Sequence, residues 1–249
     1  SFSNAWSSGG NLGTARSALA GAGTQSAGLC MGGWDTDYST VTEEYNGTSW
    51  SAGGNLATAR YKLAGCGTQS AGLCMGGNTG AYSTVTEEYD GTSWSSGGNL
   101  ATAVSSPAGA GTQAAGLCMG GYISDENSNI TSEYNGTSWS LGGSLATARR
   151  ELAGCGTQAA GLCMGGNAAS VSNVTEEYDG SAWSSGGNLA TARWNLAGCG
   201  TQSAGLCMGG DIGSVSAVTE EYDGSAWSSG GNLATARKYL AGAGTQAAG

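Results

Sequence analysis

Apolar and polar positions follow one pattern that the chain repeats. In residues 61–104, the apolar segments YKLAGCGT and SAGLCMGG are separated by a polar break at Gln69-Ser70. The next segment, STVTEEY, alternates β-branched and polar residues, which is typical of a strand. Asp90-Gly91 and then TSWSSGG follow, and Asp-Gly is a strong hairpin signal because a type I′ turn needs positive φ at both central residues. Each unit therefore predicts four short antiparallel strands, A, B, C and D.

The spacing of this unit is almost constant. The tryptophan of the W-S-x-G-G segment lies at positions 6, 50, 94, 139, 183 and 227, and AGLCMGG occurs five times. One extra residue falls between Gly121 and Tyr134. We predict a single domain over residues 1–249, with terminal part-units 1–16 and 238–249. The complete units between them are 17–60, 61–104, 105–149, 150–193 and 194–237.

A four-stranded unit repeated every 40–50 residues is the signature of an all-β β-propeller. A helical repeat does not fit, because apolar residues do not recur at i, i+3 and i+4. A parallel β-helix is the less favoured alternative, since tight Asp-Gly turns force antiparallel pairing. The chain begins with strand D character and ends with strand A and the start of B. We expect five complete blades and a sixth pooled from both ends, with a five-bladed ring or a segment of a longer protein as alternatives.

The order LCMGG, then a strand ending in EEY, then tryptophan, resembles the kelch repeat along essentially the whole chain. The kelch pattern has a hydrophobic run, a double glycine and a spaced tyrosine and tryptophan. The Tyr89-to-Trp94 spacing is shorter than is usual in that family, which fits a minimal two-residue turn. The Gly- and Ala-rich strands resemble repeats of environmental phage and bacterial proteins. The T-A-R segment that opens strand A also matches, at Arg16, Arg60, Arg149, Arg193 and Arg237.

Glycine is abundant, with 48 residues, and eight tryptophans and ten tyrosines recur among them. A glycine inside a strand costs roughly 0.5–1 kcal/mol relative to alanine, so these glycines need a structural reason. We infer that they let the backbone of one blade approach the next closely. The repeated Trp and Tyr, with Leu and Met, then fill the space between blades.

The acidic pair of T-E-E-Y recurs in four units. Neighbouring residues of a strand point to opposite faces, so the pair is not a two-carboxylate catalytic site. We expect one glutamate of each pair to bind backbone or the arginine of its unit, and the other to be solvated. The pairs are Glu43-Glu44, Glu87-Glu88, Glu176-Glu177 and Glu220-Glu221.

Five of the eight cysteines occupy the same place in strand B, where equivalents in neighbouring blades lie too far apart for a disulfide. A two-residue turn at Gln69-Ser70 places Cys66 opposite Leu73, whereas a three-residue turn would bring it to Cys74. We favour reduced, buried thiols. A zinc site is not expected, because histidine and Cys-x-x-Cys are both absent.

The units differ in two places, the B–C connections and the residues after the D–A arginine. In an up-and-down blade these connections lie at the same end, and loops on a rigid scaffold commonly carry recognition. Aromatic residues mixed with Asp and Asn suit a sugar or a polar peptide, although drift in unselected loops would give the same variation. The candidate ligand-binding residues are Trp34, Asp35, Asp37, Tyr38, Tyr61, Tyr122, Asp125, Glu126 and Trp194.

Composition narrows the possible functions. The net charge of −10 disfavours nucleic acid and anionic membranes, and no apolar run is long enough for membrane insertion. The absence of histidine removes the usual copper ligand and general base, so an enzyme like the kelch-type oxidases is the least favoured reading. We predict no cofactor, no metal and no catalytic residue.

We predict a non-catalytic binding or adhesion module that uses the face of the B–C and D–A loops, with a carbohydrate or a protein surface as partner. The alternative is a structural or assembly module of a longer array or a virion, with self-association through the incomplete terminal blade. The four Asn-x-Ser/Thr acceptors, at Asn46, Asn129, Asn135 and Asn173, weakly favour an extracellular or virion-associated location.

Overall fold

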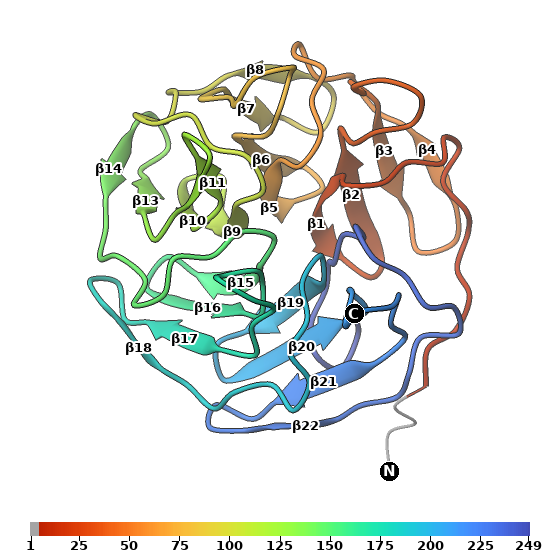
Figure 1. Cartoon of the computed structure of the whole chain (residues 1–249). Coiled ribbons are helices and arrows are strands. Elements are labelled where there is room, and N and C mark those ends of the chain that lie inside the picture. The colour runs from red at the N-terminus through yellow and green to blue at the C-terminus, as the bar shows by residue number, and fades with distance from the viewer. Residues whose placement is uncertain (1–4) are drawn as a thin grey trace.

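The computed structural model describes residues 5–249, and over that range the chain has strands and no helix. Its strands form five four-stranded antiparallel blades around a central axis, so the protein is a five-bladed β-propeller (Figure 1). Within each blade the strands pair in chain order from the axis outward. The all-β propeller and the repeat architecture predicted from the sequence are confirmed. No helix long and apolar enough to cross a bilayer is present among residues 5–249.

Each blade begins with an inner hairpin of two five-residue strands. Thr68 pairs with Ala71, which leaves a two-residue turn at Gln69-Ser70, and Cys66 therefore pairs with Leu73, the first of the two alternatives that the sequence left open. The inner strands are β1 (Ala20–Thr24), β2 (Ala27–Met31), β5 (Ala64–Thr68), β6 (Ala71–Met75), β9 (Ala108–Thr112), β10 (Ala115–Met119), β15 (Ala153–Thr157), β16 (Ala160–Met164), β19 (Ala197–Thr201) and β20 (Ala204–Met208).

The outer strands of each blade are shorter than the sequence pattern predicts. Unit three adds a small hairpin, β11 (Tyr122–Ile123) and β12 (Glu126–Asn127), in the segment that carries the extra residue. The outer strands are β3 (Thr42–Tyr45), β4 (Trp50–Ala52), β7 (Thr86–Tyr89), β8 (Trp94–Ser96), β13 (Thr131–Tyr134), β14 (Trp139–Leu141), β17 (Thr175–Tyr178), β18 (Trp183–Ser185), β21 (Thr219–Tyr222) and β22 (Trp227–Ser229).

The turn between these outer strands is not the predicted two-residue type I′ turn. Tyr89 pairs with Trp94, so the loop has four residues, and only Gly91 in it has positive φ. The Asp90 carboxylate accepts hydrogen bonds from the backbone N–H groups of Thr92 and Ser93, both at 2.8 Å. The aspartate therefore shapes the loop with its side chain, and these hydrogen bonds hold the pKa of Asp90 below its ordinary value.

Glycine sets the distance between neighbouring inner strands, as predicted. A Cβ built on Gly109 of β9 would lie 2.8 Å from the carbonyl oxygen of Gly65 on β5. A Cβ on Gly154 of β15 would lie 2.9 Å from the carbonyl oxygen of Gly109. Backbone faces backbone at this radius, and a side chain would push the blades apart.

Two side-chain hydrogen bonds join each of the second to fifth blades to the one before it. The Trp94 indole N–H donates to Thr42 Oγ1 at 2.9 Å, and the Tyr89 hydroxyl donates to Glu44. The second glutamate of the acidic pair was expected to be solvated, and that prediction is wrong for Glu44, Glu88 and Glu177. Each of these accepts a hydrogen bond from the tyrosine of the next blade, a partner that pairing within one unit does not reveal. The tryptophan and tyrosine therefore link neighbouring blades by hydrogen bonds and also fill the space between them.

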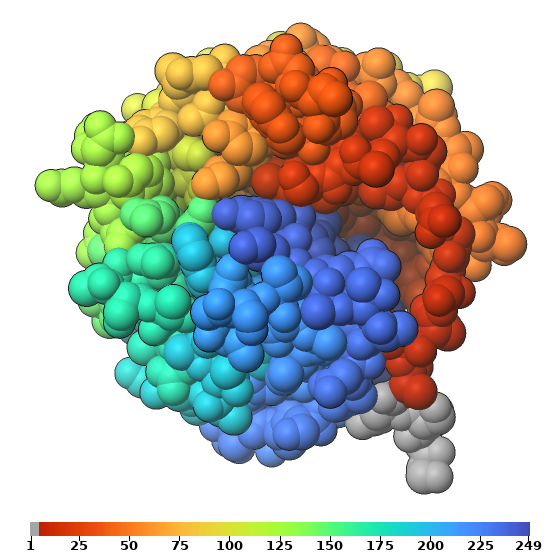
Figure 2. Space-filling model, turned by 45° about the vertical axis from the view of Figure 1, so that its right-hand side comes forward, coloured from red at the N-terminus to blue at the C-terminus, as the bar shows by residue number. Residues whose placement is uncertain are grey.

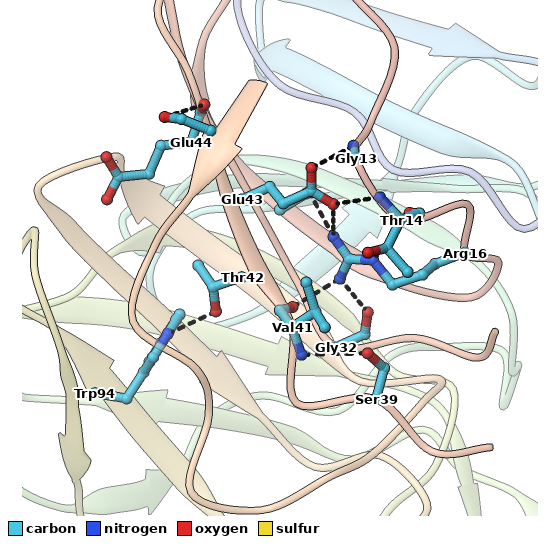
Figure 3. Close-up of polar contacts among 12 residues, drawn as sticks. Gly13, Thr14, Arg16, Gly32, Ser39, Val41, Thr42, Glu43, Glu44 and Trp94 are labelled. Carbon is cyan, nitrogen blue, oxygen red and sulfur yellow. Dashed lines mark hydrogen bonds and ion pairs between the residues drawn. The ribbon is translucent and has the colours of Figure 1, made fainter. Parts of the chain in front are cut away.

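The first glutamate of the pair binds the arginine that opens strand A of the same blade, as predicted. Arg16 donates to Glu43 at 2.9 Å and to the carbonyl oxygens of Gly32 and Val41, both at 2.7 Å (Figure 3). The carboxylate of Glu43 also accepts the Gly13 backbone N–H at 2.6 Å. One buried ion pair thus fixes both ends of the B–C loop and the incoming D–A segment.

The pooled sixth blade predicted from the chain ends is not formed. Residues 5–16 contain no strand, and residues 237–249 contain only an antiparallel bridge between Thr245 and Ala248. The C-terminal segment still lies between the fifth and first blades, where Gly244 bonds the backbones of Gly200 and Gly23. Every Thr-x-Glu-Tyr strand among residues 5–249 already belongs to one of the five blades, so an outer strand has nothing to pair with at this position.

All eight cysteines lie within the described part of the chain and are free and buried. Burial raises the pKa of the Cys74 thiol to about 11 and that of Cys163 to about 12. These thiols pack as small apolar side chains against the neighbouring blade, as predicted.

Candidate functional site on the loop face

The two variable zones lie together, on what we call the loop face: the end of the propeller that carries the B–C and D–A connections. A backbone bridge ties the two connections within each unit, at Ser17–Trp34, Tyr61–Asn78, Ser105–Tyr122, Arg150–Asn167 and Trp194–Asp211. The turns at the opposite end barely vary in sequence, and Gly47 of one such turn lies against Ser26 of the other. The buried Arg–Glu pairs that recur in four of the blades give these variable residues a fixed base.

Three of the candidate residues form an aromatic cluster at the boundary between the first two blades. Trp34 and Tyr38 come from the B–C loop of the first unit, and Tyr61 comes from the start of the second. Ring centroids lie 5.2 Å apart for Trp34–Tyr38 and 5.5 Å for both pairs with Tyr61. Trp34 remains 39% exposed, so the cluster presents an indole to solvent.

The two aspartates of that loop have a local role. Asp35 accepts the backbone N–H groups of Thr36 and Asp37, and these bonds hold its pKa below the ordinary value. Asp37 accepts the backbone N–H of Tyr38 at 2.8 Å. Both carboxylates thus shape the turn that presents the aromatic rings.

A second group surrounds the small hairpin of unit three. The Tyr82 hydroxyl donates to Asp125 at 2.6 Å, and this bond raises the pKa of Tyr82 to about 12. The Tyr82 ring lies 5.9 Å from that of Tyr122, and the Arg150 guanidinium lies 4.4 Å from the Tyr122 ring centre. Glu126 is exposed on β12. This group is separate from the aromatic cluster.

Trp194 lies in a third place, on the fifth unit. It is half-buried and its backbone pairs with Asp211. Asp211 forms an ion pair with Lys238 at 2.8 Å, which holds the pKa of the aspartate below its ordinary value. The sequence-predicted residues thus share one face but form three groups.

Sequence reasoning missed the residues at the mouth of the axis. Six residues with left-handed φ of 53–57°, one from each D–A connection, form a closed ring of backbone hydrogen bonds. In this axial ring each N–H donates to the carbonyl oxygen of the preceding member at 2.8–3.0 Å. The axial ring comprises Ala18, Lys62, Ser106, Glu151, Asn195 and Tyr239.

Such backbone is strained for residues other than glycine, and it persists only where its surroundings hold it. The axial ring uses up its own backbone donors and acceptors, so its side chains are what a ligand meets. They line a cavity of about 110 Å³ together with the next residue of each connection, which is a leucine in five of them, including Leu63 and Leu152, and Pro107 in the third. Each member lies two residues after the position of the repeated D–A arginine. The sequence shows this regular spacing, but only the structure shows that these residues meet in a closed ring.

Polar groups without partners face this cavity. Lys62 Nζ lies 2.9 Å from Glu151 Oε1, and the second carboxylate oxygen, Glu151 Oε2, lies 3.6 Å from Arg150 Nε but is buried with no hydrogen-bond partner among residues 5–249. The amide nitrogen Asn195 Nδ2 is also buried and unpartnered within that range. Lys62 Nζ also lies 5.9 Å from the Tyr61 ring, so the cavity adjoins the aromatic cluster. An acceptor, a donor and an aromatic surface are thus within one region.

No known family model matches the chain, and no curated protein matches it significantly. Within residues 5–249, no three side chains of His, Cys, Asp or Glu are grouped so that they could hold a metal ion. The loop face therefore offers stacking surfaces and hydrogen-bonding groups as its available chemistry.

Proposed function

We propose that the protein is a non-catalytic, kelch-like binding module that takes a carbohydrate on its loop face. The ligand spans the axial cavity and the adjoining aromatic cluster. This proposal is supported by the regular scaffold and by the concentration of sequence differences on one end of it. Ligand sites combine apolar and aromatic surfaces with a few placed polar groups, and this region has both.

One observation carries the proposal: two buried polar atoms of the axial ring, Glu151 Oε2 and Asn195 Nδ2, have no hydrogen-bond partner among residues 5–249. Leaving a buried donor or acceptor unpaired costs about 1–3 kcal/mol. A sugar hydroxyl is both donor and acceptor, so it can give its proton to Glu151 Oε2 while a neighbouring ring or hydroxyl oxygen accepts from Asn195 Nδ2. The apolar face of the sugar ring then lies against the exposed indole of Trp34.

Charge favours a neutral ligand. The chain carries a net charge of −10, and the Lys62 ammonium at the cavity is already paired with Glu151. An anionic ligand would meet long-range repulsion and no free cation at the cavity. The sequence has no histidine to act as the usual general base, which supports binding without turnover.

The test is a glycan-array screen followed by titration calorimetry of the strongest neutral oligosaccharide. Trp34→Ala and Asn195→Leu should each weaken binding about tenfold or more, because each removes one contact of about 1.5 kcal/mol. Leu141→Ala is the matched control, since Leu141 is 76% exposed on the outer strand β14 and lies outside the loop face. No binding to any glycan, or equal losses in Leu141→Ala, would contradict the proposal.

A second candidate function is an assembly module, and the open position between the fifth and first blades favours it. Light scattering separates the two. A protein that remains monomeric at high concentration and still binds glycan supports the carbohydrate module, whereas concentration-dependent oligomers without glycan binding support assembly.

A further inference from the structure

The position between the fifth and first blades is open on its outer side. We call this position the gap. Figure 2 shows the hollow there, between the N-terminal part of the chain in red and the C-terminal part in blue. Its volume is about 320 Å³, and its lining includes Trp6, Gln25, Leu206, Thr219, Glu221 and Gly249. Because the five blades are nearly identical, the contacts that the gap lacks can be identified by comparison with the other blade boundaries.

The fifth blade has an unused tryptophan acceptor. At the four other boundaries, the strand-C threonine accepts an indole N–H from the next blade at 2.8–2.9 Å. The equivalent Thr219 Oγ1 is buried and has no partner among residues 5–249, although the residue lines the gap. Trp6 packs against the apolar cluster of the fifth blade, but its indole does not donate to Thr219. Without a paired strand C beside it, the segment around Trp6 is not a strand.

The fifth blade also has an unused tyrosine acceptor. Tyr222 donates its hydroxyl to Glu177 at 2.6 Å, and the same bond joins each earlier pair of adjacent blades. The tyrosine hydroxyl also accepts a backbone N–H, as Tyr222 does from Gly187 at 3.2 Å. The equivalent residues at the gap are Glu221 and Gly231, and both line it without such a tyrosine. Together they form a socket for a tyrosine hydroxyl.

The arginine that opens the C-terminal segment lacks the glutamate that its equivalents bind. Arg16, Arg60, Arg149 and Arg193 each open strand A of a blade and pair with the first glutamate of that blade, and their side chains are fully buried. Arg237 occupies the equivalent position, but it is exposed and has no ion pair among residues 5–249. A carboxylate placed in the gap would complete the same arrangement.

The first blade shows matching vacancies on its own side. Neither the Tyr45 hydroxyl nor the Trp50 indole N–H has a hydrogen-bond partner within residues 5–249, whereas their equivalents Tyr89 and Trp94 bind the preceding blade. Those partners are the second glutamate and the threonine of strand C. The unpaired groups on the two sides therefore define the sequence of one strand. Its threonine would accept from Trp50, its first glutamate would pair with Arg237, its second glutamate would accept from Tyr45, and its tyrosine would donate to Glu221.

The inner edge of the gap also lacks a pairing strand. In the fifth blade, β19 and β20 pair over five residues, from Thr201–Ala204 to Ala197–Met208. In the C-terminal segment, pairing is limited to the Thr245–Ala248 bridge. The segment 241–244 is thus not paired with a second strand, and an unpaired backbone edge is a template for an added strand.

We propose that the gap binds a β-hairpin of a partner polypeptide, with an apolar inner strand of the Leu-Cys-Met type and an outer strand that reads Thr-Glu-Glu-Tyr. The hairpin completes the four-stranded arrangement beside the C-terminal segment. Main-chain pairing gives the inner strand its affinity, and the side-chain vacancies on both sides give the outer strand its specificity.

The probe is a labelled synthetic peptide that copies residues 206–222 of the chain, LCMGGDIGSVSAVTEEY. Its affinity for the whole protein is measured by fluorescence anisotropy in reducing buffer. Saturable binding is expected for this peptide and not for a scrambled one. The peptide changes Glu220→Gln and Tyr222→Phe should each weaken binding about tenfold, because each removes a hydrogen bond that involves a charged group. Asp211→Asn in the peptide is the charge-matched control and should leave the affinity unchanged.

The protein variants test the sockets directly. Arg237→Met should weaken the native peptide about tenfold and should have little further effect on the Glu220→Gln peptide, because the two groups form one pair. Lys238→Met removes the same charge one residue away, where the lysine pairs with Asp211 on the loop face, and should not weaken binding. Absence of saturable binding overturns the proposal. So do equal losses in Arg237→Met and Lys238→Met, which would show general charge attraction.

Discussion

The third blade suggests a sharp test of the buried ion pairs, because it lacks both partners. Val104 and Ser132 replace the arginine and the glutamate of that blade, and Val104 packs into the apolar cluster between the second and third blades. The equivalent pair of the second blade is Arg60 and Glu87, whose side chains are 0% and 2% exposed. We predict that the double variant Arg60→Val with Glu87→Ser is more stable than Arg60→Val alone.

The magnitudes follow from the contacts. Arg60→Val leaves the Glu87 carboxylate buried with only the backbone N–H groups of Ala57 and Thr58, at 2.7 and 3.3 Å. Removing one partner of a buried pair costs about 3–5 kcal/mol. The double variant removes the orphaned charge, and it should recover about 2 kcal/mol or more of that loss, since replacing a whole buried pair is often close to neutral.

The assay is urea unfolding followed by tryptophan fluorescence, for the wild type, both single variants and the double variant. A double-mutant cycle gives the coupling free energy between the two positions. A double variant whose loss equals the sum of the two single losses would refute the reasoning, because the pair would then not act as one unit.

Three further predictions concern the scaffold. Gly109→Ala should destabilise the protein by about 1–3 kcal/mol, because its Cβ would meet the backbone of β5. Gly230→Ala should destabilise it less, since the nearest neighbour of that Cβ is the flexible Glu221 side chain, and urea unfolding would compare the free energies of unfolding of the two variants. Thr131→Val should cost about 1 kcal/mol through the lost Trp183 bond, and Thr219→Val, whose hydroxyl is unpartnered, should not destabilise, as thermal unfolding would show. Native thiols should resist a disulfide reagent at pH 8, because burial raises the pKa of Cys74 from an ordinary 9.0 to about 11, and fast labelling of the folded protein would contradict this. The contribution of the protonated Cys74 thiol to stability should be fully present below pH 9 and should be lost as the pH rises toward 11.

Local pattern was enough to predict the blades. Thr68-Gln69-Ser70-Ala71 specifies a two-residue turn, and that turn sets the register of the whole inner hairpin, including Cys66 opposite Leu73. The role of glycine could also be inferred, because its recurrence in strands needs a close backbone neighbour. These features depend on contacts within a unit or on the repeat itself.

Contacts between units were beyond local pattern. The second glutamate binds a tyrosine 45 residues further on, as Glu44 does with Tyr89, and no spacing rule within one unit indicates that partner. The aspartate of the outer turn was misread because its side chain, and not two positive φ angles, closes the loop. The prediction of a sixth blade was wrong for a related reason. Strand D forms only against a strand C, which residues 5–249 do not supply at that position.

The candidate site was predictable as a face but not as a cavity. Variation among units located Trp34, Tyr38 and Tyr61, and the structure brings these three rings together. Glu151 and Asn195 attract no attention in the sequence, because their importance comes from the closed hydrogen-bond ring around the axis. The ring forms only when residues from all the D–A connections meet at the axis, so no single unit of the sequence reveals it.

The most direct test of the proposed loop-face site is an NMR titration that follows the tryptophan indole N–H signals as the selected oligosaccharide is added. The account predicts that the signal of Trp34, which is exposed on the loop face, shifts with saturation. The signals of Trp94, Trp139, Trp183 and Trp227 should stay, since their indoles are bonded to threonines between blades. Shifts confined to those four signals, with Trp34 unmoved, would contradict the account.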